Sequence, residues 1–520
     1  MNRRDILRIA GFSSFFQAGI PSSHATQTTS AQFDAAKIPS YFFDIKSNNR
    51  DVERVYFNSN FDENCEYDVV VIGSGMAGGI IATSASNRGM KTLLLDAGGL
   101  SHFVHTSNLH ISQTLDVVAP YGQSIDSASY GGVAFCFGGK SIFWSNVIPR
   151  MEQWELNHWP SEIGRYLLDS GYDLAERLLR KQTSFQQNQD ILVADMRNRF
   201  TDFQVTNLPR AFHTPAPGQR RGFPDERSTG AFSTAALITS SLANGNRNLV
   251  VNFNHAAISI ETSKETATGV LCFDIVEKRV RKFKGKKIVL CAGALESPRI
   301  ALTSNLVDRS GKIGIGPTYH QAATMQFTIP DDFGYLTRFD QAKIFMRPTD
   351  LSRVESYTCE LALNWQFWDA KCEDDYAWDK RYGNPGPAKS TIKFLFRRQL
   401  DDSNSIRLSG DSAEIKISQM SGEPNKSEIS NLKNRVIQYF NADKRYIYEP
   451  IVYENEGDAY WHIAGSLRMG GREIGVIDEN LRFHEYSNLF ACDLSIFPDI
   501  PAANPSLTLA ALAIRLGNHL

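Results

Sequence analysis

The chain has 520 residues, of which 42% are hydrophobic and 22% charged, and such a composition suits a soluble globular protein with one large core or two. A formal net charge of -2 and the absence of long like-charge runs argue against nucleic-acid binding and charged tails. The seven cysteines form no Cys-x-x-Cys pair, which argues against zinc, iron–sulfur and attached-haem sites. These properties favour a small-molecule partner.

Residues 1–25 differ from the rest of the chain. Arg3-Arg4 precedes a mildly apolar stretch at 9–20, and Ser23-His24-Ala25 then offers small residues for cleavage. This order is typical of a twin-arginine export signal, which carries folded, cofactor-loaded proteins. The stretch is too short to span a bilayer. An irregular N-terminal helix is the alternative, whereas export predicts a periplasmic or secreted protein.

The first clear element is the apolar, β-branched run at 67–72, which predicts a buried parallel strand. It leads into the glycine-rich turn 73–79, and apolar residues then recur at helical spacing through 85. A second strand at 91–95 ends at Asp96, 23 positions after Gly73. Gly-x-Gly-x-x-Gly between a strand and a helix, followed by an acid at this distance, indicates dinucleotide binding.

Each residue of this motif has an expected role. Gly73 permits the tight turn, Gly75 lets the backbone approach a pyrophosphate, and Gly78 lets helix and strand pack closely. The helix N-terminus favours the phosphates, and Asp96 can accept hydrogen bonds from both hydroxyls of the adenosine ribose. The alternative is a glycine-rich turn with an incidental acid. The motif alone does not distinguish FAD from NAD.

The middle of the chain changes character several times. Residues 100–150 are rich in glycine, which is typical of a loop that wraps a ligand, and 161–200 is helical and charged. Further strands are expected at 249–253, 256–260, 270–273 and 287–291. Residues 311–456 are rich in aromatics with strand-like pieces, which predicts an inserted substrate domain. Residues 457–520 return to the strand-and-helix pattern of the first part of the chain.

Four motifs in this order resemble those of the glucose-methanol-choline (GMC) oxidoreductases. The glycine turn is the first, and Gly131-Gly132 with Gly138-Gly139-Lys140-Ser141, Trp144 and Asn146 is similar to the family loop that covers the flavin. Residues 288–299, around Gly293, resemble the second family signature. Residues 461–470 and 488–498, then Asn504-Pro505 before a final helix, resemble the C-terminal signature. Residues 311–456 contribute no signature.

The resemblance implies an α/β fold, with a discontinuous Rossmann-type FAD-binding domain and an inserted sheet-based substrate domain. The expected bounds are 64–155 with 215–310 and 457–520 for the FAD domain, and 156–214 with 311–456 for the substrate domain. Phe143 occupies the position of the histidine that tethers flavin in some relatives, so we expect noncovalent FAD. Ser304-Asn305 stands where the second family signature usually has a Ser-Gly pair, so the sequence does not decide the geometry of that turn.

Alcohol oxidation by hydride transfer needs a base for the hydroxyl proton and an acceptor for the hydride. The resemblance assigns His462 as the base, flavin N5 as the hydride acceptor, and Asn504 as the residue that orients the hydroxyl. Asp493 resembles the acid that contacts the ribityl chain. The remaining expected FAD contacts are Gly139, Trp144, Asn146, Gly293 and Pro505.

Each assignment has a structural alternative. His462 is then a packed core histidine, Asp493 a strand-end turn, and Asn504 the N-cap of a helix with Pro505 at its first position. A helix beginning there would also point its positive end at the flavin. No metal site is expected, because His102, His105 and His110 lack carboxylate or cysteine support.

The predicted function is oxidation of a primary or secondary alcohol, with a sugar or polyol as the leading substrate class and an external quinone or cytochrome as acceptor. Three alternatives stay open at this point. They are an oxygen-using alcohol or sugar oxidase, a lyase on the same fold, and a flavin-bearing subunit of a membrane electron-transfer complex.

Overall fold

The computed structural model describes residues 37–43, 45, 47, 50–100, 118–119, 133–182, 187–211, 231–330, 333, 342–350, 357–363, 389–410, 413–418, 426–441, 451–452 and 462–520. The predicted export signal, the three histidines between 102 and 110, and Gly131-Gly132 lie outside these residues. Cys372 also lies outside the described residues. Cys359, the cysteine nearest to it in sequence, is buried.

The first sheet has seven strands in the order β8-β2-β1-β11-β10-β9, with β20 paired to β11. Its parallel strands are β1 (Glu66–Ile72), β2 (Thr92–Leu95), β8 (Leu249–Asn252), β11 (Arg279–Leu290) and β20 (Leu489–Ala491). Strands β9 (His255–Ser263) and β10 (Thr266–Asp274) join β11 in an antiparallel meander. The predicted strands are confirmed, although β11 begins at Arg279 rather than at 287.

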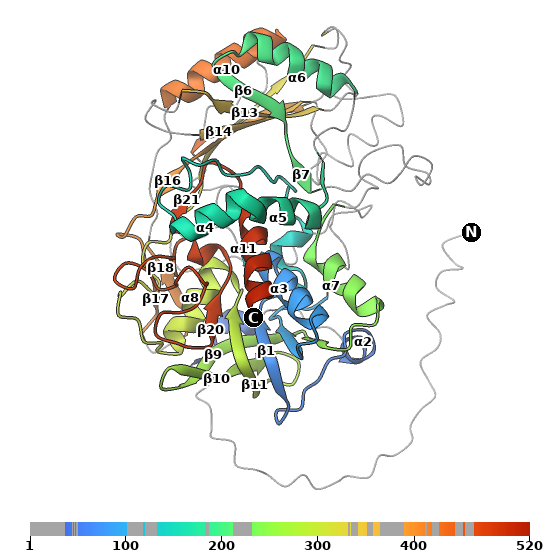
Figure 1. Cartoon of the computed structure of the whole chain (residues 1–520), viewed down its shortest axis with the longest axis vertical. Coiled ribbons are helices and arrows are strands. Elements are labelled where there is room, and N and C mark those ends of the chain that lie inside the picture. The colour runs from blue at the N-terminus through green and yellow to red at the C-terminus, as the bar shows by residue number, and fades with distance from the viewer. Residues whose placement is uncertain are drawn as a thin grey trace, which may run out of the picture. The chain divides into compact units, whose positions relative to one another are not determined.

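Helices α3 (Met76–Asn87) and α11 (Ser506–His519) pack together against this sheet (Figure 1). Arg88, just after α3, donates hydrogen bonds to the carbonyls of Gly517 and Asn518 at 2.9 and 2.6 Å. The ends of the two helices therefore lie together, and the helices run parallel. Because α3 begins directly after β1, α11 also begins at the carboxyl edge of the sheet.

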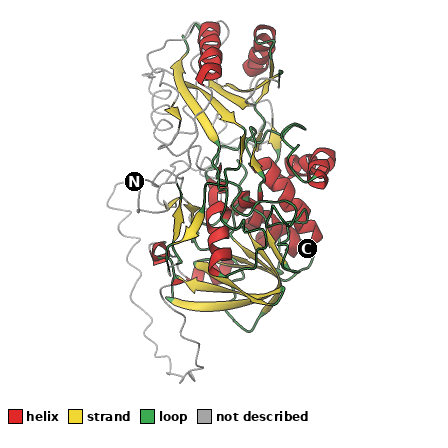
Figure 2. Ribbon diagram, turned by 90° about the vertical axis from the view of Figure 1, so that its left-hand side faces the viewer, coloured by secondary structure: helices red, strands yellow, loops and turns green. Residues whose placement is uncertain are grey.

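The second sheet has six strands, all antiparallel, in the order β19-β12-β15-β14-β13-β6. The strands are β6 (Phe203–Asn207), β12 (Gln321–Thr328), β13 (Ala342–Pro348), β14 (Tyr357–Leu363), β15 (Lys389–Phe396) and β19 (Ile451–Val452). Helices α6 (Gln187–Arg199) and α10 (Lys426–Phe440) cover one face and share its core (Figure 2).

The expected substrate domain divides between the two cores, which corrects part of its boundaries. Residues 161–178 form α4 (Ser161–Tyr166), the π-turn η6 (Leu167–Gly171) and α5 (Tyr172–Leu178), and these pack on α11. Tyr166 Oη, for example, donates to the carbonyl of Ala511 at 2.9 Å. Of the predicted helical stretch, α6 alone joins the six-stranded sheet. The reason is that charge composition does not say which core a helix's apolar side will meet.

The remaining elements are short or connect the sheets. Helix α7 (Thr234–Ala243) packs on α3, and α8 (Gly293–Thr303) packs on β9 and on the hairpin of β17 (Ile406–Leu408) and β18 (Ile415–Ile417). The others are η2 (Ser40–Phe43), α2 (Arg50–Tyr56), β3 (Val118–Ala119), β4 (Val133–Ala134), η5 (Gly139–Ile142), β5 (Lys181–Gln182), β7 (Arg210–Ala211), β16 (Arg398–Gln399), η10 (Leu494–Ile496) and β21 (Asp499–Ile500).

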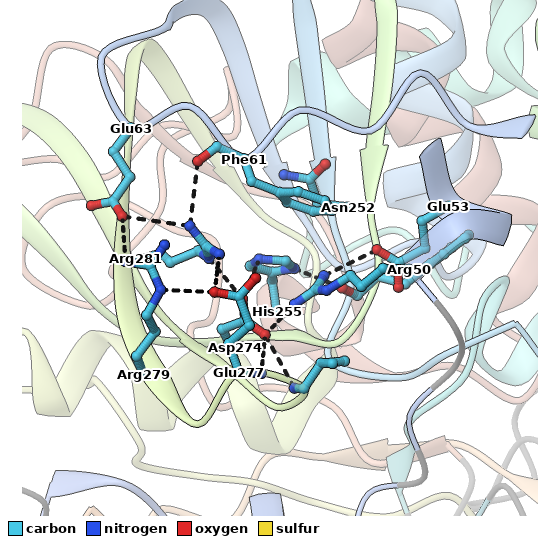
Figure 3. A network of polar contacts seen from close by, with 12 residues as sticks. Arg50, Glu53, Phe61, Glu63, Asn252, His255, Asp274, Glu277, Arg279 and Arg281 are labelled. Carbon is cyan, nitrogen blue, oxygen red and sulfur yellow. Dashed lines mark hydrogen bonds and ion pairs between the residues drawn. The ribbon is translucent and has the colours of Figure 1, made fainter. Parts of the chain in front are cut away.

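Helix α2 had no sequence prediction, and a buried ionic network fixes it to the meander (Figure 3). Asp274, at the end of β10, accepts hydrogen bonds from Arg50 of α2 and from Arg281 Nε, the latter at 2.7 Å. Arg50 also pairs with Glu53 at 3.1 Å.

Among the described helices, none is both long enough and apolar enough to cross a membrane.

Candidate active site

The carboxyl edge of the seven-stranded sheet gathers the ends of four parallel strands. Backbone bonding continues past these ends, as in the 2.8 Å bond from Cys291 N to the carbonyl of Ile72. In open α/β sheets, ligands bind at this edge where the strand order reverses, which here is at β1. The predicted residues that follow these strands within three positions are Gly73 after β1, Asp96 after β2, Gly293 after β11 and Asp493 after β20.

The three glycines of the turn differ in what surrounds them. Gly73 has a φ of +99°, and a Cβ there would lie 2.4 Å from the carbonyl oxygen of Cys291. A Cβ on Gly78 would lie 1.9 Å from the Gly73 oxygen, so both positions need glycine for packing. A Cβ on Gly75 meets no described atom within 4 Å. Gly75 therefore leaves the space that an approaching pyrophosphate needs.

The expected covering loop lies over this turn. A Cβ on Gly139 would come 3.0 Å from the Cα of Gly75, and Gly138 N donates to Ser74 Oγ at 2.8 Å. Trp144 and Asn146 continue the loop: Trp144 Nε1 donates to the Phe232 carbonyl at 2.9 Å, and the Asn146 backbone bonds Ala211. These bonds hold the loop in place. Flavin contacts of Trp144 and Asn146 stay predictions.

The start of α3 and Asp96 fit the two halves of an adenosine diphosphate. Helix α3 has no side-chain cap at Gly75 within the described structure, so its first N–H groups can bind phosphate. Asp96 accepts from Ser74 N and Gly98 N, both at 2.8 Å, and from Ser74 Oγ. A carboxylate has about four acceptor sites, so roughly one is left, enough for one ribose hydroxyl rather than two.

Burial raises the pKa of Asp96 to about 6, against the opposing effect of its hydrogen bonds from Ser74 and Gly98. Asp493 is similarly buried, and burial raises its pKa as well. Its Oδ2 accepts from Gly293 N at 2.9 Å and Ser297 Oγ at 2.6 Å, and its Oδ1 accepts from Ser495 N at 2.8 Å. Asp493 thus joins the start of α8 to η10, and its ribityl contact stays a prediction.

Asn305 resolves the turn that the sequence left open. Its φ is +48°, in the left-handed region that asparagine tolerates better than most residues. Its N–H bonds the carbonyl of Leu302 at 3.0 Å and closes α8. Asparagine therefore adopts here the left-handed conformation that glycine adopts most readily.

His462 lies beside a second histidine that sequence analysis missed. Thr318 and Ala464 form an isolated antiparallel bridge, so His320 lies opposite His462. Their Nδ1 atoms are 3.1 Å apart. His320 is fully buried, whereas His462 is partly exposed. The only sequence signal for His320 was a lone histidine between turn glycines and an alternating strand.

Both imidazoles are held neutral. Burial, followed by the charges of Lys393 and Lys140, lowers the pKa of His462 to about 3. Burial, His462, Lys393 and Arg398 hold the pKa of His320 well below its usual value. Burial also lowers the pKa of Lys140 to about 8. A neutral imidazole is the form that can accept a proton.

Asn504 does not cap α11, which corrects the N-cap alternative. The helix begins at Ser506 with Pro505 as its N-cap, and no described side chain caps it. The side chain of Asn504 is buried, and its Oδ1 has no hydrogen-bond partner within the described ranges. The preceding residues are fixed by bonds from Thr358 Oγ1 to the Ala502 carbonyl and from Ala503 N to Glu155 Oε1, at 2.8 and 2.9 Å. An unpaired buried oxygen suits a ligand contact.

A Rossmann-type sheet with an open glycine cradle, a buried acid after β2, and a neutral histidine near the same edge indicate a dinucleotide-dependent oxidoreductase. Residues 68–314 match the family described as FAD binding domain, and residues 416–513 match the family described as GMC oxidoreductase. With an FAD-binding match over the first half and a GMC match near the C-terminus, the chain is similar to the GMC oxidoreductases. It is an FAD-dependent enzyme that acts on alcohol-type donors.

One curated relative and one solved structure illustrate the likeness. The chain is 22% identical over 510 residues to the uncharacterised GMC-type oxidoreductase y4nJ of Sinorhizobium fredii (strain NBRC 101917 / NGR234), covering 88% of this chain and 95% of that protein. It is similar in fold to pyridoxine 4-oxidase from Mesorbium loti, with a TM-score of 0.59 and 14% identity. That match covers 87% of this chain and 98% of the oxidase.

Proposed function

We propose that this enzyme oxidises a primary or secondary alcohol group of a sugar or polyol, with His462 as base and Asn504 as the group that orients the hydroxyl. The observation that carries the proposal is His462 itself: the residue keeps some solvent exposure, while burial of its ring and positive neighbours lower its pKa and keep it neutral. The alcohol proton goes to this imidazole, and FAD, when bound, would supply the acceptor for the hydride of the carbinol C–H.

The positive groups near His462 support alcohol chemistry in a second way. Lys140 and Lys393 weaken His462 as a base, as its pKa shows. The same charges stabilise negative charge on a substrate oxygen as its proton leaves. Asn504 adds an amide at the start of α11, whose positive end also faces this edge.

The substrate class is tested by anaerobic mixing of the FAD-loaded enzyme with sugars, polyols, alkanols and pyridoxine while flavin absorbance is followed. Bleaching by a sugar or polyol supports the proposal. Bleaching by pyridoxine alone would overturn the substrate class and favour a hydroxymethyl heterocycle, the substrate type named for the structural neighbour. Bleaching by no alcohol, with FAD bound, would reject the proposed function.

The acceptor is proposed to be a quinone or cytochrome, because this chain carries no haem or cluster motif of its own. The bleached enzyme is mixed in parallel with oxygen and with a soluble quinone. Faster reoxidation by quinone supports a dehydrogenase. Reoxidation by oxygen at the rate of turnover, with no gain from quinone, would make the enzyme an oxidase.

FAD is proposed to be held noncovalently, since Phe143 cannot form a histidyl bond. Acid precipitation should release the flavin into the supernatant, and flavin in the pellet would contradict this.

Export is proposed on the basis of Arg3-Arg4 and the weakly apolar stretch after it. Residues 1–40 fused to a reporter that needs folded transport should be exported, and Arg3-Arg4→Lys-Lys should block it.

A further inference from the structure

The pairing of His320 with His462 is built into the backbone. Thr318 and Ala464 exchange two backbone hydrogen bonds, of 2.9 and 3.0 Å, and the antiparallel register carries on to the histidines. The imidazole centroids are 5.3 Å apart, with the ring planes inclined by 38°. The Nδ1 atoms are each ring's nearest nitrogens, at 3.1 Å.

A hydrogen bond between two Nδ1 atoms requires one hydrogen. Which of the two rings supplies it determines whether His462 can act as a base. If neutral His320 supplies it, neutral His462 carries its own hydrogen on Nε2 and cannot accept a proton there. If His462 supplies it, the Nε2 of His462 has a free lone pair. Only the second arrangement makes His462 a base.

We propose that His320 is a positioning residue that accepts the Nδ1–H of His462 and so keeps the lone pair on His462 Nε2. This inference rests on the proposed function, since it takes His462 as the base. When the substrate O–H bond breaks, its proton forms the new bond to Nε2. The Nδ1–H bond to His320 then becomes charge-assisted and stronger.

The surroundings of the pair keep His320 neutral, which leaves this ring able to act as the acceptor. Among the described residues, the charged groups that act on the two rings are cationic, namely Lys140 of η5, Lys393 of β15 and Arg398 of β16. They oppose protonation of His320, so its Nδ1 keeps a lone pair once its one hydrogen is on Nε2. That Nε2 is buried and makes no hydrogen bond within the described part of the chain. The Nδ1 contact is thus the polar contact that orients the His320 ring.

Three substitutions at 320 separate the two ring nitrogens. In His320→Asn, the amide oxygen occupies the place of Nδ1 and can still accept the hydrogen of His462. In His320→Gln, the longer amide reaches the place of Nε2 instead, and His320→Leu removes both. FAD absorbance and thermal unfolding are measured for each variant to compare folded, FAD-loaded protein.

His320→Leu should slow anaerobic flavin reduction by at least about tenfold with little change in the substrate KM, because much of His462 moves to the wrong tautomer. His320→Asn should recover most of the rate, and His320→Gln should not. A merely structural role would not make recovery follow the position of the acceptor atom. If His320→Leu does not fold, the Asn and Gln variants still decide.

Recovery by Gln but not by Asn would assign the role to Nε2 and overturn the proposal, as would a wild-type rate in His320→Leu. His462→Ala separates this failure from failure of the proposed function. A wild-type reduction rate in His462→Ala removes the base itself. A large loss there, with no effect of His320→Leu, removes only the positioning role.

Discussion

Two buried histidine clusters in this enzyme have opposite electrostatic surroundings. His255 stacks on Phe61, and its Nε2 lies 3.6 Å from Asp274, whose carboxylate also pairs with two arginines (Figure 3). Within the part of the chain that the structure describes, the charged groups that act on His462 and His320 are cationic.

Charge compensation therefore distinguishes the two regions. Although burial raises the pKa of Asp274, the backbone of Glu277 and the side chain of Arg281 bring it below its usual value. That cluster holds α2 against the meander and is ionically balanced. The His320–His462 pair, by contrast, has a second histidine and positive groups acting on it, and no acid acts on it within the described residues. Such an arrangement costs stability and is expected where chemistry requires it.

The largest expected effect is in the catalytic pair. His462→Ala should lower the rate of anaerobic flavin reduction by about 10² to 10⁴, the range for a positioned base, with FAD still bound. Stopped-flow absorbance measures the rate. His255→Ala is the control, because it removes a buried histidine from the other cluster. Equal losses of rate in the two variants would mean that His462 has no catalytic role beyond that of a buried histidine.

In the balanced cluster we expect the reverse, a loss of stability without a change in chemistry. Asp274→Ala removes the buried carboxylate that Arg50 and Arg281 share. This should cost about 3 kcal/mol of unfolding free energy, the low end for a broken buried pair, because Glu53 and Glu277 still pair with the two arginines. Glu277→Ala, at a side chain 41% exposed, should cost less than about 1 kcal/mol. Urea unfolding of the FAD-loaded protein measures both. A loss at Asp274 as small as that at Glu277 would contradict the role of the cluster.

Local sequence patterns predicted the cofactor half of this structure well. A continuous apolar run followed by a glycine turn forms β1 and α3 through neighbouring residues, so no distant information was needed. His320 and the Asp274 cluster escaped prediction because their partners lie far away in sequence. His320 and His462 are 142 positions apart, and Arg50 and Asp274 are 224 apart. Single residues in a polar stretch carry no sign of such pairing.

A pH experiment sharpens the comparison further. Burial, opposed by Asp274, lowers the pKa of His255 to about 4 from an ordinary 6.5. Between these values the unfolded chain binds a proton that the folded protein does not, so stability falls as pH falls from 6.5 to 4. One pKa unit corresponds to about 1.4 kcal/mol, so His255 should lower the free energy of unfolding by on the order of 2 to 3 kcal/mol between pH 6.5 and pH 4. His255→Asn should lack that part of the slope, and an unchanged slope would assign it to other groups.

The glycine turn offers a smaller and more specific test of the cofactor edge. Gly75→Val fills the open space at the turn and should weaken FAD binding at least about tenfold, or 1.4 kcal/mol. Gly471→Val is the matched control, because a Cβ there also meets no described atom within 4 Å. Fluorescence titration of the apoprotein with FAD gives both affinities. Equal affinities would place the pyrophosphate elsewhere.

The smallest expected change in stability is at Asn504, where it decides between two roles. An N-cap asparagine would cost about 0.5 to 2 kcal/mol on substitution by alanine. Because Asn504 does not cap α11 and its Oδ1 is unpaired, Asn504→Ala should change the unfolding free energy by less than about 0.5 kcal/mol. Flavin reduction should still slow by about tenfold or more, since one hydrogen bond to a charged oxygen contributes about 1.5 to 3 kcal/mol. Asn504→His, which keeps a hydrogen-bonding side chain at this position, should retain more activity than alanine. Loss of stability in proportion to loss of rate would return Asn504 to a structural role and leave His462 without its partner.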